Sequence, residues 1–342
     1  MRANMQTATT RDHVDHRKSG SPPDLSVVVC LTCGNPAALN ECLEALHRSS
    51  ANLNLECIVP YDSRLANADA MVRQWRWVTF IDVRSVVDPI RVGRRTHEHH
   101  HVLRALGIRR ARAEIVGMLE DHGIPGPGWC AAVMNAHRGR AAVIGGAVDN
   151  RVDRVLNWAI YFCDFSRFRN PVPAHPVEYV TDINIAYKRE ALWSVRDHWF
   201  NAFHETAVNT GLRDSGELLM LDSNMVVYQN RTDLRLGPAL IERYVWGRAF
   251  GGARVAQVSV GHRCLYASLA FLLPAMRTWR HGRAALTRQP CPRRFFAALP
   301  LIVLLELFWC LGEWIGTLTG RPDGARPRTR SATTESCATS PS

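Results

Sequence analysis

The stretch GMLEDHGIPGPGW, residues 117–129, decides the fold and raises the functional question. An apolar run that begins at Ile115 ends abruptly in Glu120, Asp121 and His122. Two prolines and three glycines follow within the next six residues. The pattern predicts a buried strand that ends in a turn. Carboxylate and imidazole groups at a strand end can hold a divalent cation, although a solvated turn with no ligand has the same composition.

The residues on either side predict further strands and helices. Asn35 and Pro36 supply a helix cap and a first-turn proline, and HVLRALGIRRARA (101–113) predicts a second helix. A short helix is expected over 204–213, followed by a hairpin-like pair of strands before residue 230. Strands are predicted at Leu25–Leu31 and in LECIVPYDS (55–63), RWVTFIDV (76–83), EIVGMLEDH (114–122), AAVIGGAVDN (141–150) and EYVTDINIAYKREAL (178–192), the last running into a helix.

The alternation of strands and helices, with polar residues at the strand ends, predicts an α/β fold with an open parallel sheet and helices on its faces. In such sheets, ligands bind beyond the carboxyl ends of the strands. Thr32, Asp62 and the Glu120–His122 cluster each follow a predicted strand. The sequence therefore predicts that these residues share one edge of the sheet.

Cysteine and histidine patterns do not predict a zinc site. Cys30 and Cys33 match a CxxC spacing, but no second CxxC or paired histidine completes a tetrahedral set, so buried free thiols are expected. The tract RTHEHHH (95–101) is interpreted as a solvated helix start, because consecutive histidines cannot all face one ion.

The charge distribution points to an anionic partner for the C-terminal third. The 342-residue chain has a net charge of +11, and ten arginines lie between Arg243 and Arg294. No Asp or Glu occurs between Arg243 and Glu306. Nucleic acid and an anionic membrane surface are the candidates, and the neighbouring apolar segments favour the membrane.

The segment FFAALPLIVLLELFWCLGEWIGTLTG (295–320) is long enough to span a bilayer. Glu306 and Glu313 are seven residues apart and share a helix face, which suits an interfacial helix or a span with one protein-facing side. An apolar helical subdomain packed on the main domain is the alternative. Residues 1–24, which have no apolar signal region, and 320–342 are expected to be disordered.

Several blocks, in this order, resemble the family 2 glycosyltransferases: SVVVCLTCGNPAALNECLEAL, RALGIRRARAEIVGMLEDHGIPGPGW, IGGAVDN, DINIAYKREAL and FHETAVNTGLRDSG. The resemblance spans residues 25–230. It implies the GT-A fold, with a nucleotide-binding open mixed sheet over about 25–240. The basic and apolar residues that follow predict a membrane-associated helical region over 241–319. The resemblance also implies inverting sugar transfer from a nucleotide-diphosphate sugar, UDP-sugar by family frequency, with Mn²⁺ or Mg²⁺.

The resemblance assigns roles to individual residues. Glu205 would be the general base that deprotonates the acceptor. Asp182 and Asn184 would line the acceptor side. Glu120, Asp121 and His122 would bind the metal. The residues expected near the nucleotide sugar are Thr32, Asp62, Arg104, Glu120 and Asp121.

Each role has a structural alternative. Asp-Ser at 62–63 commonly opens a turn, Arg104 could be an exposed helical arginine, and Glu205 could simply stabilise a helix N-terminus. The family's usual Asp-rich motif is replaced by Glu-Asp-His, and His favours Mn²⁺ over Mg²⁺.

The expected function is thus metal-assisted transfer to a glycan or lipid-linked acceptor at the cytoplasmic face of the inner or plasma membrane. The chain would be peripheral or held by one C-terminal span. Two alternatives stay open. A GT-A-like protein could bind sugar nucleotides without turning them over, or the basic region could bind nucleic acid, for which no recognised module is present.

Overall fold

The computed structural model describes residues 21–32, 35–63, 72–83, 97–255, 258–259, 261–263, 268, 272–287 and 291–320. Cys33 and most of the predicted disordered ends lie outside these residues. The chain forms two compact units. The sheet unit comprises residues 1–235 and 281–301, and the helical unit comprises residues 236–280 and 302–342.

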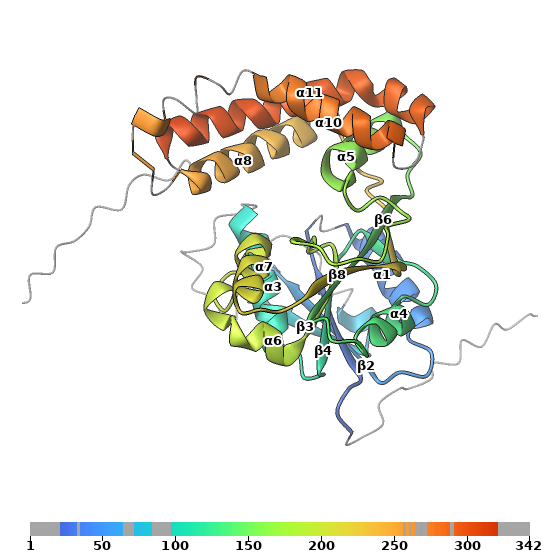
Figure 1. Cartoon of the computed structure of the whole chain (residues 1–342). Coiled ribbons are helices and arrows are strands. Elements are labelled where there is room, and N and C mark those ends of the chain that lie inside the picture. The colour runs from blue at the N-terminus through green and yellow to red at the C-terminus, as the bar shows by residue number, and fades with distance from the viewer. Residues whose placement is uncertain are drawn as a thin grey trace, which may run out of the picture. The chain divides into compact units, whose positions relative to one another are not determined.

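Eight strands form one mixed sheet in the sheet unit, in the order β3-β2-β1-β4-β7-β6-β8-β5 (Figure 1). β1 to β4 are mutually parallel, β7 is antiparallel to both of its neighbours, and β5 runs antiparallel to β8. The strands are β1 (Leu25–Cys30), β2 (Leu55–Tyr61), β3 (Val78–Asp82), β4 (Ile115–Glu120), β5 (Gly123–Pro125), β6 (Val143–Asn150), β7 (Asn184–Lys188) and β8 (Leu219–Gln229).

Helices cover both faces of this sheet. Figure 1 shows α1 and α4 on one side and α3, α6 and α7 on the other. The helices are α1 (Pro36–Ser49), α3 (His97–Arg110), α4 (Trp129–Ala136), α5 (Val155–Phe165), α6 (Arg189–Ser194) and α7 (Glu205–Asp214). The predicted cap is confirmed, because the Asn35 side chain accepts the Ala37 N–H at 3.0 Å.

The core follows the two-residue period of β1, which is buried along its whole length. Val27 and Val29 join a cluster that includes Trp129 of α4. Val28 points the other way and meets α3 at Gly107, where a Cβ atom would lie 2.3 Å from Val28 Cγ1. Only glycine allows α3 to lie this close to the strand.

One predicted element is wrong. The segment before residue 230 forms the single strand β8, which is eleven residues long, and not a pair of strands. After Asp222 the register of this strand shifts opposite Gly146 and Ala147. An irregularity within one strand gives the same local sequence signal as a tight hairpin turn.

The predicted fold class is confirmed: an α/β fold whose open mixed sheet is flanked by helices, with one apolar C-terminal helix. The remaining long helices are α8 (Leu236–Arg254), α10 (Leu273–Thr287) and α11 (Pro292–Thr319). Among the described residues, α11 alone is long and apolar enough to cross a membrane by length and composition, with a mean hydropathy of 2.2 over its most apolar window.

Candidate functional site

Strand directions bring three polar segments to one edge of the sheet. β1 and β4 are parallel neighbours whose last residues, Cys30 and Glu120, pair with each other. β7 runs the opposite way and begins at Asn184, opposite Leu119 of β4. Asp182, two residues before β7, therefore reaches the edge at which β4 ends. This antiparallel strand is the reason why residues far apart in the sequence meet.

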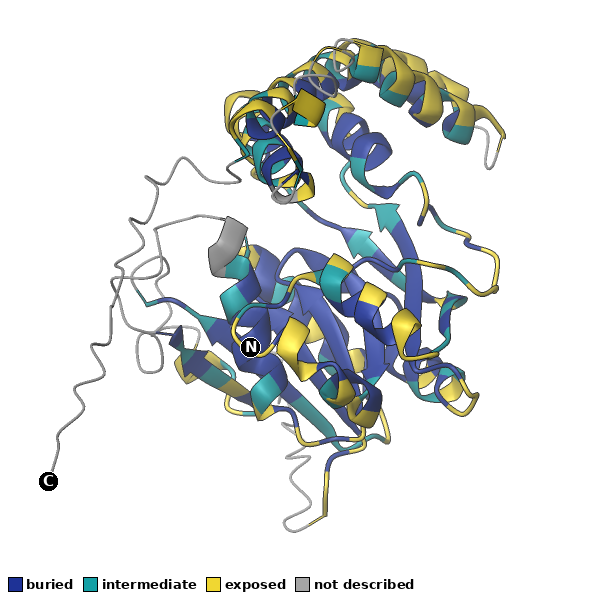
Figure 2. Cartoon of the chain, turned by 60° about the vertical axis from the view of Figure 1, so that its left-hand side comes forward, coloured by how far each residue is buried: buried dark blue, intermediate teal, exposed yellow. Residues whose placement is uncertain are grey.

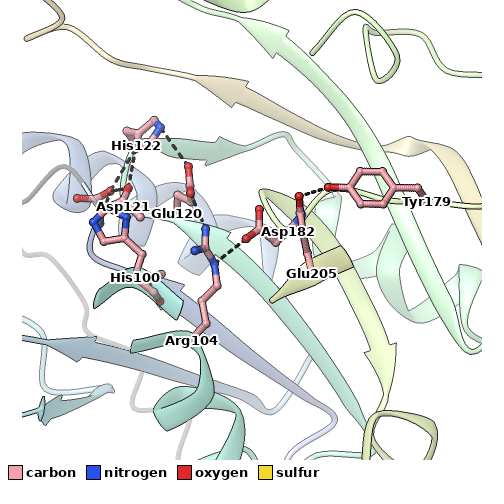
Figure 3. A network of polar contacts seen from close by, with 10 residues as sticks. His100, Arg104, Glu120, Asp121, His122, Tyr179, Asp182 and Glu205 are labelled. Carbon is pink, nitrogen blue, oxygen red and sulfur yellow. Dashed lines mark hydrogen bonds and ion pairs between the residues drawn. The ribbon is translucent and has the colours of Figure 1, made fainter. Parts of the chain in front are cut away.

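Arg104 of α3 joins two carboxylates at this edge (Figure 3). Its Nη2 atom lies 2.7 Å from Glu120 Oε1, and its Nε atom lies 3.0 Å from Asp182 Oδ2. The Arg104 side chain is only 5% exposed. Burial by itself would lower the pKa of Arg104, but Asp182 and Glu120 beside it raise the pKa above its ordinary value. Arg104 is thus a fixed internal cation and not an exposed helical arginine.

The Glu120–His122 segment forms the next part of the same network. His122 lies between its two neighbours, with Nε2 3.3 Å from Glu120 Oε2 and Nδ1 3.2 Å from Asp121 Oδ1. Thr32 donates both its backbone N–H and its hydroxyl to Asp121 Oδ1, at 3.2 and 2.8 Å. Burial raises the pKa of Glu120, while His122 and Arg104 act against this shift.

Glu205 completes the network from the first turn of α7. Its Oε2 atom accepts the backbone N–H of Asp182 at 2.7 Å, and its Oε1 atom accepts the hydroxyl of Tyr179. Burial raises the pKa of Glu205 from 4.5 to about 7, although the Asp182 N–H and the Arg104 charge lower it. A carboxyl group that titrates near neutral pH can accept and release a proton under physiological conditions.

The donor atoms fit a divalent cation only in part. Asp121 Oδ1 and His122 Nδ1 lie 3.2 Å apart, so one ion could contact both, and carboxylate with imidazole suits Mn²⁺. Glu120 faces the other nitrogen of the same ring and is held by Arg104. The three side chains therefore do not present their ligand atoms to one point in this arrangement.

Two further predicted residues, Asp62 and Asn184, are also buried. Extending the parallel register of β1 and β2 by four residues puts Asp62 opposite Thr32, at the same edge, and its side chain is buried. Asn184 is fully buried. Its amide donates to the carbonyls of Ala147 and Met225, both at 2.8 Å, and accepts the indole N–H of Trp129. Through these contacts Asn184 holds β6, β8 and α4 to β7. The side chain has no exposed surface that could face an acceptor.

Two residues of the site were missed in the sequence. Tyr179 is separated from Glu205 by 26 residues, and no local pattern connects the two. His100 belongs to the histidine tract interpreted as a solvated helix start. Figure 3 shows its ring turned toward the Asp121 carboxylate. Consecutive histidines do not share one ligand, but one member of the tract can still face the site because helix positions diverge by 100°.

Comparisons with known proteins give a fold likeness only. No protein-family profile matches the chain, and no curated protein matches it in sequence. Among solved structures, the chain is similar to the mannosyltransferase PcManGT from Pyrobaculum calidifontis, determined in complex with GDP-Man and Mn²⁺. The identity is 15%, the TM-score is 0.43, and the match covers 88% of this chain and 87% of that one. At these values the likeness to this glycosyltransferase assigns no activity to the present chain.

Proposed function

We propose that the chain is an inverting glycosyltransferase that moves a sugar from a nucleotide-diphosphate sugar, expected to be a UDP-sugar, to a hydroxyl of a glycan or lipid-linked acceptor. One observation carries the proposal. A continuous set of buried and half-buried polar contacts leads from Glu205 through Asp182 and Arg104 to Glu120, His122 and Asp121. This set of contacts connects Glu205, whose carboxyl group is suited to proton transfer, with Asp121 and His122, which are suited to binding a cation.

Glu205 would act as the general base. Its ionised carboxylate would take the proton from the acceptor hydroxyl as the oxygen attacks the anomeric carbon and the bond to the diphosphate breaks. The Tyr179 hydroxyl and the Asp182 N–H hold both oxygens of the carboxylate, and so fix its direction. A single base and a single displacement invert the configuration at that carbon.

Asp121 and His122 would hold the divalent cation. When bound, the ion takes up negative charge that develops on the departing diphosphate. Thr32 fixes the Asp121 carboxylate through two hydrogen bonds. Arg104 would act through Glu120 and Asp182, whose positions it sets, and Asp62 would contact the nucleotide at the neighbouring strand end. Glu120 would belong to this support and would not bind the ion.

Hydrolysis and transfer assays test the proposal directly. UDP- and GDP-sugars would be incubated with the full chain, with and without Mn²⁺ or Mg²⁺, and the release of nucleoside diphosphate would be followed. We expect cation-dependent turnover of one nucleotide class, lost in Asp121→Ala and in Glu205→Gln. Glu178→Gln, at a glutamate whose side chain is 93% exposed, is the matched control and should keep full turnover.

A binding protein without turnover is the second candidate. It is favoured by His122, which occupies the space between the Glu120 and Asp121 carboxylates. A thermal-shift panel of nucleoside diphosphates separates the two functions, because a ligand that binds only the folded state raises its stability. Stabilisation by a nucleotide together with no cleavage of any nucleotide sugar, with any acceptor offered, would favour binding alone.

A further inference from the structure

In the helical unit, α11 buries polar side chains and exposes a stripe of apolar ones. Glu306, Glu313 and Thr317 are 0%, 3% and 2% exposed, and they are buried together with the apolar Ile302 and Leu305. Five large apolar side chains face outward, at 38–48% exposure, and recur at intervals of three or four residues along one stripe: Val303, Leu307, Leu311, Trp314 and Leu318. This stripe, called here the α11 stripe, is about 22 Å long. Helices of proteins that fold in water show the opposite arrangement.

The two inward glutamates are paired within the helical unit. Arg277 of α10 forms an ion pair with Glu306, and Arg254 of α8 lies 3.0 Å from Glu313. The ring of Trp309 is contacted by the guanidinium groups of Arg243 and Arg277, at 5.7 and 4.8 Å from its centroid. Its indole N–H donates to Glu313 at 3.2 Å. Charged side chains that turn inward and pair are typical of helices in an apolar solvent.

The packing of α8 against α11 is also of the membrane type. Gly247 and Gly251 of α8 face the carbonyls of Trp309 and Glu313, where added Cβ atoms would lie 2.1 and 2.3 Å from the oxygens. Gly312 and Gly316 of α11 face the carbonyls of Tyr244 and Arg248 in return, at 2.1 and 2.2 Å. The contacts advance in the same direction along both helices, which are therefore parallel. Two small-xxx-small pairs that allow backbones to touch are characteristic of helices packed in lipid.

The other two helices expose apolar side chains as well. On α8 the exposed fractions are 65% for Ile241 and 37% for Val245, and on α10 they are 58% for Met276 and 66% for Trp279. Figure 2 shows exposed residues recurring along the helices of this unit. Large apolar groups left outside on three helices, with charges paired inside, indicate a surface that is covered by something apolar.

We propose that the helical unit inserts into the interfacial layer of one anionic membrane leaflet, with the α11 stripe toward the acyl chains. The charge of the surrounding sequence selects a lipid surface. The 62 residues between Arg243 and Glu306 contain no acidic residue, and ten arginines lie between Arg243 and Arg294. Arginines near the surface attract anionic headgroups, each contributing about 1 kcal/mol. A soluble protein partner offers no comparable reason for an excess of one charge beside an apolar stripe.

The ion pairs place α11 along the membrane and not across it. In a spanning α11, Glu306 would lie near the bilayer centre and would bring α10 there through its ion pair with Arg277. The neighbouring Arg280 is exposed, and an exposed arginine at that depth is costly. The Arg254 side chain, which pairs with Glu313, is 44% exposed. Both arginines reach water or headgroups only if the helices lie in the interface.

Vesicle flotation with the full chain tests this inference without any sugar nucleotide, so its result is independent of the proposed sugar transfer. Vesicles of phosphatidylcholine alone would be compared with vesicles containing about one third phosphatidylglycerol. We expect binding to the anionic vesicles. The double variant Leu307→Gln/Leu311→Gln should weaken it roughly tenfold or more. The control Val155→Gln/Phe200→Gln changes two residues of similar exposure in the sheet unit and should weaken it less than about twofold.

Four results would overturn the inference. The first is absence of binding to either vesicle, and the second is equal loss of binding in the two double variants. The third is resistance of the bound chain to alkaline carbonate extraction, which would indicate a spanning helix. A change in the oligomeric state of Leu307→Gln/Leu311→Gln, with vesicle binding intact, would identify the α11 stripe as a contact between copies instead. Circular dichroism of both double variants verifies that each is folded.

Discussion

At the scale of single residues, the pKa of Glu205 links the structure to both stability and the proposed reaction. Its carboxyl group is held by two donors and is nevertheless raised in pKa to about 7, because burial outweighs the hydrogen bonds and the nearby Arg104 charge. The folded state therefore binds a proton on Glu205 more tightly than the unfolded state does. As pH rises from 4.5 to 7, the unfolded chain releases this proton first, and the stabilisation of the folded state is lost.

Glu205→Gln should remove this pH dependence. Wild type should lose up to about 3 kcal/mol of unfolding free energy relative to the variant between pH 4.5 and pH 7. Urea unfolding at several pH values measures the difference, with Glu178→Gln as the control for loss of a glutamate at an exposed position. A constant difference between wild type and Glu205→Gln across this range would show that Glu205 titrates at an ordinary pH.

Tyr179 should act on the reaction through Glu205. Removing its hydroxyl in Tyr179→Phe takes away a donor that favours the ionised carboxylate, so the pKa of Glu205 should rise further. We expect the acidic limb of the kcat/KM profile to move to higher pH by about one unit. Tyr161→Phe, which removes a buried hydroxyl that donates to the Val148 carbonyl, should lower stability but leave the profile in place.

Arg104 should be required for folding as much as for activity. Arg104→Met leaves Glu120 and Asp182 buried without their cation, which should cost about 3–5 kcal/mol at pH 7. The loss should be smaller at lower pH, because burial raises the pKa of Glu120 and this carboxyl group can then take up a proton. Arg112→Met is the matched control: Arg112 pairs with Glu56 at 2.6 Å but is 74% exposed, so about 1 kcal/mol or less is expected. Equal losses in the two variants would contradict a buried ionic role.

At the scale of elements, the direction of β7 assembles the site. A parallel β7 would carry Asp182 to the opposite edge of the sheet, away from Arg104 and Glu120. Asn184 helps to hold β7 in place, because it bonds to β6, β8 and α4 at once through Ala147, Met225 and Trp129. Asn184, which was predicted to face the acceptor, thus supports the site indirectly by holding β7 in place.

The glycine contacts between α8 and α11 give a prediction at the same scale. Gly312→Ala would put a Cβ atom 2.1 Å from the Tyr244 carbonyl oxygen, so the helices must separate at a cost of about 1–3 kcal/mol. Gly237→Ala, where no atom lies within 4 Å, should be neutral or stabilising by up to about 1 kcal/mol. Hydrogen exchange of α8 and α11 amides measures the effect locally. Unchanged protection in Gly312→Ala would show that the two backbones do not touch.

At the scale of the whole molecule, the two proposals concern different units and should be separable by mutation. Mn²⁺ with the preferred nucleoside diphosphate, at about one hundred times its dissociation constant, should stabilise the chain by about 2.7 kcal/mol. Asp121→Ala should lose this stabilisation and retain vesicle binding. Leu307→Gln/Leu311→Gln should retain this stabilisation and lose vesicle binding. Melting curves and flotation on the same preparations compare the two, and joint loss in either variant would contradict independent roles.

Much of the sheet unit could be predicted from local sequence. The apolar run of β4, the cap at Asn35 and the polar residues after β1 and β4 are short-range signals, because strand burial, capping and turn formation depend on neighbouring residues. The shared edge of Thr32 and Glu120–His122 also followed from the rule that parallel strands end together. The hairpin predicted before residue 230 was wrong, since an irregular strand and a turn look alike locally.

What the sequence by itself determined is the α/β fold class, the strand ends that carry Thr32, Asp62 and Glu120–His122, and the apolar, basic character of the C-terminal third. Only the tertiary structure decided that β7 runs antiparallel, that Arg104 joins Glu120 to Asp182, that Tyr179 contacts Glu205, and that Glu306 and Glu313 turn inward. The physical reason is that strand direction, burial and charge pairing depend on contacts between residues distant in sequence, and these contacts exist only once the chain is packed.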